Sequence, residues 1–152
     1  MDHQGMVHAL EEIRRMLRPG GSLIDIHPFQ KAPVTEVHQR GRVLFAEPRV
    51  AYDYDEDIQQ AEQALARCVR RRLFVREHSR EFDFFTYGSS VPELREFLKE
   101  ANAFHESSVD DADAAREAEF YDRVERIMKA AGKGAEVAMH ERVRIARLKP
   151  TG

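Results

Sequence analysis

The sequence predicts an α/β fold with about three main strands in a mixed sheet, helices on the faces of that sheet and a small β-hairpin. Apolar residues recur at helical spacing in several long segments, and short apolar runs follow proline or glycine turns. The order of these segments does not repeat the strand–helix unit of a parallel sheet. We expect one domain over residues 1–152, because this length suffices for a single buried core.

The composition is typical of a soluble globular protein with a heavily charged surface. Apolar residues make up 42% and charged residues 34% of the chain, and the formal net charge is −3. This charge argues against nucleic-acid binding, which favours basic domains, and no apolar run is long enough to span a bilayer. The single cysteine, Cys68, excludes an internal disulfide framework. We therefore expect a cytoplasmic protein that binds neither nucleic acid nor membranes.

An amphipathic helix is predicted over residues 4–17, followed by a strand over residues 22–27. The apolar residues of the helix recur at three- and four-residue steps. Pro19 cannot continue the helix, and one of the two glycines after it can adopt the left-handed conformation that ends it. The strand has the sequence SLIDIH, in which the apolar residues Leu23, Ile24 and Ile26 indicate that both faces are largely covered.

The next segments predict a small hairpin and a second helix. Residues 34–38 and 42–46 form the hairpin around Gly41, whose positive φ the turn requires. A third apolar run, residues 50–54, extends the hairpin or crosses to the helix. The helix covers residues 56–71, with acids at its start and arginines at its end, as the helix dipole favours.

Residues 73–87 predict one long strand, or two strands with a break near Ser79. The side chains of such a strand alternate between its faces. Phe82 and Phe84 are expected on one face. The other face is expected to carry Asp83, Phe85 and Tyr87.

The last third of the chain predicts two helices and a final strand. Ser90 and Glu93 have capping-box spacing and begin a helix that ends at Asn102, with Phe97 in its apolar stripe. A polar loop over residues 106–113 follows. A helix over about 114–131 and a strand over 136–148 complete the chain.

Residues 9–28, ALEEIRRMLRPGGSLIDIHP, resemble the middle of a class I S-adenosylmethionine-dependent methyltransferase. In that family a helix that ends in a Pro-Gly-Gly turn leads into the fifth strand of a Rossmann-like sheet. The matching positions are Leu10, Ile13, Leu17, Arg18, Pro19, Gly20, Gly21, Leu23 and Ile24. The helix at 56–71 and strands at about 80–87 and 137–148 resemble the family's C-terminal part. The hairpin, at about 34–47, resembles an insertion in some bacterial members.

The resemblance implies that the chain supplies only the C-terminal half of the family's domain. In the family, a glycine-rich loop after the first strand holds the methionine end of the cofactor. The present sequence has no G-x-G-x-x-G motif between a strand and a helix. We therefore assign no cofactor-binding residue and expect no cofactor for this chain alone. The chain is expected to be a shortened gene product, the product of a misassigned start site, or a half-domain that acts with a partner.

The candidate substrate-pocket residues are Asp25, His27 and Phe29, at the carboxyl end of strand 22–27. Ligands of open α/β sheets bind beyond the carboxyl ends of parallel strands, and the resemblance implies an acceptor-substrate pocket at this edge. His27 can accept or orient a proton near neutral pH. The alternative is a strand-end histidine that bonds to a neighbouring loop. No catalytic residue follows from the sequence.

Other clusters have simpler explanations than catalysis or ligand binding. The seven histidines show no zinc-binding spacing, so no metal site is predicted. The arginines within residues 67–76 can contact phosphate or RNA. They also suit a solvated helix end whose charges pair with Glu62, Glu77 and Glu81. Cys68 is expected to be a small core residue.

Three functions remain open at this point. The first is a methyltransferase-like protein without independent methyl-transfer activity, and the second is a fragment of an active small-molecule methyltransferase. The third is a nonenzymatic dimeric interaction module. In the resembling family the strand equivalent to 22–27 lies between the fourth strand and the last. Without a fourth strand its apolar edge is unpaired, which favours a homodimer through this edge or a partner chain that supplies the other half.

Overall fold

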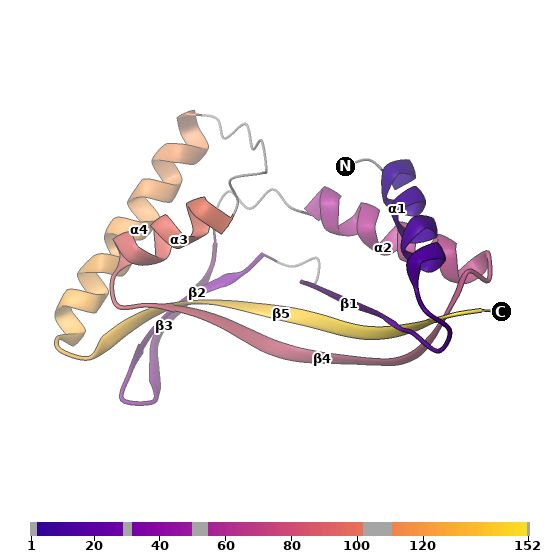
Figure 1. Ribbon diagram of the computed structural model, residues 1–152. Coiled ribbons are helices and arrows are strands. Elements are labelled where there is room, and N and C mark those ends of the chain that lie inside the picture. The colour runs from indigo at the N-terminus through magenta and orange to yellow at the C-terminus, as the bar shows by residue number, and fades with distance from the viewer. Residues whose placement is uncertain (1–2, 29–31, 50–54, 102–110, 152) are drawn as a thin grey trace. The chain divides into compact units, whose positions relative to one another are not determined.

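The computed structural model describes residues 3–28, 32–49, 55–101 and 111–151. This part of the chain contains both helices and strands, interspersed along the sequence (Figure 1), which confirms the α/β class. None of the described helices is long and apolar enough to cross a membrane. In chain order the elements are α1 (His3–Met16), β1 (Leu23–Pro28), β2 (Val34–Gln39), β3 (Arg42–Pro48), α2 (Asp55–Arg70), β4 (Phe74–Gly88), α3 (Val91–Ala101), α4 (Asp111–Ala131) and β5 (Ala135–Pro150).

The chain divides into two compact units. The first unit consists of Met1–Lys31, Tyr54–Phe82 and Arg142–Gly152, and the second consists of Ala32–Asp53 and Asp83–Glu141. The long strands β4 and β5 each contribute residues to both units. Each unit has a hydrophobic core of its own.

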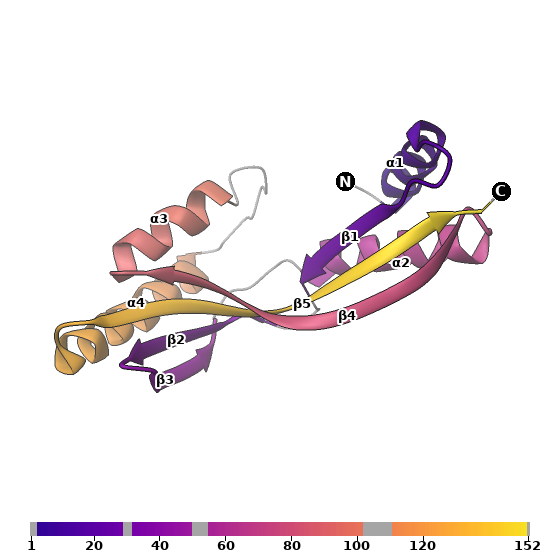
Figure 2. The same cartoon turned by 60° about the horizontal axis from the view of Figure 1, so that its bottom comes forward.

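The central strand of the sheet is β5. β1 pairs with residues 143–148 of β5 and β2 pairs with residues 135–140, both antiparallel. β4 also pairs with β5, and Figure 2 shows the two strands running in opposite directions. β3 completes the hairpin with β2. The three main strands β1, β4 and β5 and the hairpin were expected, but the expected mixed sheet is wrong, because neighbouring strands of the five-stranded sheet are antiparallel.

In the first unit, α1 and α2 cover one face of the strands (Figure 1). Val7 of α1 and Leu65 of α2 are buried there against Phe74 and Leu148 of the sheet. The amphipathic pattern that predicted both helices is confirmed, because their apolar sides form this core.

The two faces of β1 differ in their exposure. Leu23 packs into the core of the first unit, whereas Ile24 and Ile26 on the other face are 51% and 58% exposed. The expectation that both faces of this strand are covered is wrong, because the helices of the first unit lie on one face. Among the described strands, β1 pairs with β5 alone and is therefore an outer strand.

In the second unit, α3 and α4 pack on one face of β2 and β5. Leu94 and Val124 of the helices are buried against Val37 and Val137 of the strands. Phe97 was expected in the apolar stripe of α3 but is 50% exposed, because it lies at the margin of the face that α3 buries.

Some predicted boundaries change. β4 is continuous, so the alternative break near Ser79 is wrong. α4 already begins at Asp111, where a loop was expected, because acids in the first turn favour a helix start. Residues 50–54 and 102–110, which include the third apolar run and most of that loop, lie outside the described residues. The hairpin turn has positive φ at both Arg40 and Gly41, 50° and 74°, as a type I′ turn requires.

Candidate functional site

The sequence-predicted residues Asp25 and His27 lie on β1 in the first unit, on the face toward α2. Their separation of two residues places both side chains on the same face of the strand. His27 is opposite Arg144 in the β1–β5 register. Glu62 reaches the same point from α2. Phe29, the third predicted residue, lies outside the described residues.

These four side chains form a chain of charged contacts, which we call the His27 cluster (Asp25, His27, Glu62, Arg144). His27 Nδ1 lies 2.9 Å from Asp25 Oδ2, and His27 Nε2 lies 3.3 Å from Glu62 Oε1. Arg144 Nη1 donates a hydrogen bond of 2.6 Å to the same Glu62 oxygen. The His27 side chain is only 12% exposed, so these partners replace most of its contact with water.

Both ring nitrogens of His27 face carboxylate oxygens, which favours the doubly protonated imidazolium. The Asp25 contact lacks hydrogen-bond geometry, so it stabilises the ring as an ion pair. The Asp25 carboxylate raises the pKa of His27 most strongly, burial opposes this effect, and Glu62 raises the pKa further. The net result is a pKa above the ordinary 6.5. Below this raised pKa the ring is protonated, so it can donate a proton but cannot accept one.

The sequence identified two members of the His27 cluster but not Glu62 or Arg144. Glu62 was expected, together with Glu77 and Glu81, to pair with the arginines at the end of α2. The structure instead pairs these three acids with arginines of β5, namely Arg144, Arg147 and Arg142. The available signal was the three arginines of residues 142–147, RVRIAR, which give β5 positive charges on both of its faces.

The protonated state of His27 predicts a pH dependence of stability. Because the folded pKa is raised above the unfolded value near 6.5, the stabilisation is complete below that value and is lost as pH rises through the folded pKa. We expect the melting temperature of wild type to fall between about pH 6 and pH 9, and the fall to be smaller in His27→Gln. Equal slopes in the two proteins, measured by thermal denaturation, would contradict this assignment.

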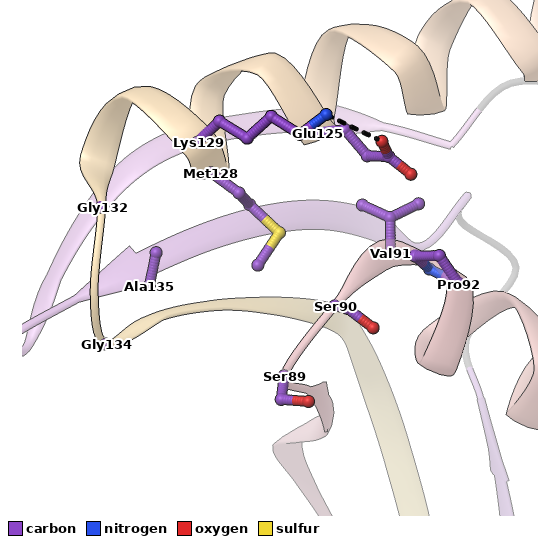
Figure 3. A pocket seen from close by; sticks show the side chains of 10 residues that line it. All are labelled: Ser89, Ser90, Val91, Pro92, Glu125, Met128, Lys129, Gly132, Gly134 and Ala135. Atoms are coloured by element: carbon purple, nitrogen blue, oxygen red, sulfur yellow. Dashed lines mark ion pairs between the residues drawn. The ribbon is translucent and has the colours of Figure 1, made fainter.

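A separate pocket of about 450 Å³ lies in the second unit, between the start of α3 and the end of α4. Figure 3 shows the Met128 side chain extending into it and the Glu125–Lys129 ion pair, 3.7 Å long, at its side. Ser89 and Ser90 contribute hydroxyls, but both interact with Glu93 and cap α3. The predicted capping of α3 is thereby confirmed. Neither Asp25 nor His27 is among the residues that line this pocket.

Metal and thiol chemistry find little support in the described part of the chain. Those residues contain no group of three or more histidine, cysteine or acidic side chains that could hold a metal ion. Cys68 is fully buried in the core of the first unit, as expected, and burial raises the pKa of its thiol. A buried thiol of raised pKa is a poor nucleophile.

Comparisons with protein-family models, with curated proteins and with solved structures found no match to this chain.

Proposed function

We propose that the protein is a methyltransferase-like chain that does not transfer methyl groups by itself and acts as a dimer or with a complementary chain. The observation that carries this proposal is that β1 is an outer strand with an exposed apolar face. The equivalent strand of class I methyltransferases is an interior strand. The edge of β1 that pairs with no described strand therefore corresponds to the edge at which the fourth strand pairs in that family.

The order of elements supports the same relationship. The helix α1, the Pro-Gly-Gly turn and β1 are followed by α2, β4 and a last strand, β5, that is antiparallel to β1 and beside it. In the resembling family the last strand also pairs with the fifth. The hairpin β2–β3 and the helices α3 and α4 lie between these elements in the chain and form most of the second unit. We interpret them as insertions into a Rossmann-like C-terminal half.

Of the outer strands, β1 is the best suited to pair with another chain. β4 carries alternating charges, among them Arg76, Glu77 and Arg80, and charged residues protect a sheet edge from unwanted pairing. β3 carries charged residues near both of its ends, Arg42 and Glu47. On its open face β1 instead exposes uncharged isoleucines. We propose a homodimer through the β1 edge, or a partner chain that pairs there and supplies the cofactor-binding half.

In this proposal the His27 cluster marks the acceptor side of the site. Asp25 and His27 lie near the carboxyl end of β1, where open α/β sheets bind ligands. The His27 ring is held at this edge between the carboxylates of Asp25 and Glu62. The acceptor class stays undefined, because methyl transfer depends mainly on positioning of the reactants.

The chain alone is expected not to bind S-adenosylmethionine. Its sequence has no glycine-rich strand–helix turn to receive the methionine end of the cofactor. Isothermal titration calorimetry of S-adenosylmethionine into the purified chain should give only heat of dilution. A saturable signal with one site per chain would contradict the proposal.

The second candidate is a fragment of an active small-molecule methyltransferase, and the exposed face of β1 also favours it. In-frame sequence upstream of Met1 that encodes a glycine-rich strand–helix turn would support this candidate. The longer product would then bind S-adenosylmethionine and show no tendency to dimerise through β1. A third candidate is a nonenzymatic dimeric module. It fits if the dimer forms and neither the present chain nor a longer gene product binds S-adenosylmethionine.

A further inference from the structure

The second unit contains a histidine cluster that the proposed function does not use. α3 and α4 cover the face of the sheet that carries Val37 and Val137. Side chains alternate between the faces of a strand, so Glu36 of β2 and His140 of β5 project from the opposite face. Asp83 of β4 reaches His140 from the other side of β5. The cluster therefore joins three neighbouring strands.

The Glu36 carboxylate contacts two histidines at once. Its Oε1 atom lies 2.8 Å from His140 Nδ1, and its Oε2 atom lies 2.5 Å from His38 Nε2. Glu36 is only 8% exposed, so these rings replace most of its hydration. The second nitrogen of His140, Nε2, lies 3.2 Å from Asp83 Oδ1.

The arrangement favours two protons on His140. A carboxylate only accepts hydrogen bonds, and a neutral imidazole carries one N–H. A neutral His140 would therefore present a lone pair to either Glu36 or Asp83. The imidazolium instead donates to both carboxylates.

Aromatic packing favours the same charged state. The His140 ring stacks on Phe85 with ring centres 4.3 Å apart and an angle of 20° between the planes. A cation over an aromatic face is stabilised by the ring quadrupole. His38 meets the same group of rings edge-on, against Tyr87 at 5.6 Å.

We propose that Glu36, His140 and Asp83 form a pH-sensitive latch across β2, β5 and β4, closed while His140 is an imidazolium and weakened when it loses a proton. The charged groups in contact with His140 are Glu36 from β2 and Asp83 from β4, and His38 acts on it through Glu36. Loss of the proton removes one carboxylate contact. Because β4 is an outer strand, the contact between its Asp83 and His140 is the weaker point of the latch.

The direction of the pH effect follows from these contacts. Burial disfavours the charged ring, but the hydrogen bonds to Glu36 and Asp83 outweigh burial and raise the pKa of His140 above 6.5. The latch is therefore fully closed below the unfolded value near 6.5 and opens as pH rises through the folded pKa.

NMR of the full chain, with ¹⁵N-labelled histidine, tests the latch directly. We expect His140, assigned with His140→Gln, to titrate above pH 6.5 and to have both nitrogens protonated at pH 6. Asp83→Asn should lower the midpoint and leave the proton on Nδ1, facing Glu36. Asp83 is partly exposed, so this variant should keep the fold even if Glu36→Gln does not.

The matched control is Glu119→Gln, which removes an exposed acid of α4 and should leave the His140 midpoint unchanged. Amide exchange provides the second measurement. After correction for intrinsic rates, the protection of residues 83–88 should fall as pH rises through the midpoint in wild type but not in His140→Gln. A midpoint at or below 6.5, a single tautomer at pH 6, or protection independent of pH would overturn the proposal.

Discussion

Phe74→Ala is expected to lower the free energy of unfolding by about 3–5 kcal/mol, the largest stability effect we predict for a single substitution. Phe74 is 1% exposed at the start of β4 and lies in the core of the first unit with Leu65, Cys68 and Leu148. Truncation removes the buried ring and leaves a cavity between α2 and the sheet. Urea denaturation followed by circular dichroism measures the loss.

Phe84→Ala is the matched control, because it removes the same side chain from the same strand. Phe84 is 48% exposed, so the loss is expected to stay below about 1 kcal/mol. A similar loss in both variants would show that the core of the first unit is not centred on Phe74.

Ile26→Lys is expected to weaken self-association of the protein by roughly 30-fold or more. A lysine buried without a partner costs at least about 2 kcal/mol, and about 1.4 kcal/mol corresponds to tenfold in a dissociation constant. Ile26 is 58% exposed within the chain, so the charge should leave the fold intact and act only where β1 meets a second chain. Sedimentation velocity over a concentration series measures the change.

The control for this substitution is Val43→Lys on β3, another outer strand of the sheet. Val43 is 54% exposed, so the two variants add the same charge at similarly exposed sites. We expect Val43→Lys to associate like wild type. If it dissociates the protein as strongly as Ile26→Lys does, association is nonspecific or uses the β3 edge.

Local patterns in the sequence predicted most of the elements. The helical spacing of Met6, Leu10 and Ile13 predicted both ends of α1 to within one residue. Gly41 correctly marked the hairpin turn. These features depend on neighbours within a few positions, which a sequence displays directly. The same is true of the alternation along β4, where Asp83 and Phe85 share a face as expected, since both contact His140.

Contacts between distant segments were not predictable in the same way. Whether Ile24 is buried depends on which face α1 and α2 cover, and the isoleucine itself does not specify that face. Glu62 and Arg144 are 82 residues apart in the chain. They meet because of the β1–β5 register and the position of α2. His140 likewise meets Glu36 across 104 residues. Such pairs require the topology, which single-sequence patterns do not determine.

Two histidines, one in each unit, are held between pairs of carboxylates. His27 lies between Asp25 and Glu62, and His140 lies between Glu36 and Asp83. Each arrangement stabilises the imidazolium, so both units should become less stable as pH rises above their raised pKa values. Site-resolved NMR separates the two contributions, which a melting curve of the whole chain combines.

Sedimentation velocity of the wild-type chain at micromolar concentration tests most directly whether β1 is an association surface. The outer position of β1 and its exposed isoleucines predict a species of twice the chain mass, which Ile26→Lys reduces to the mass of one chain. A single-chain species at every concentration, with Ile26→Lys indistinguishable from wild type, would contradict the proposal that β1 joins a second copy of the protein.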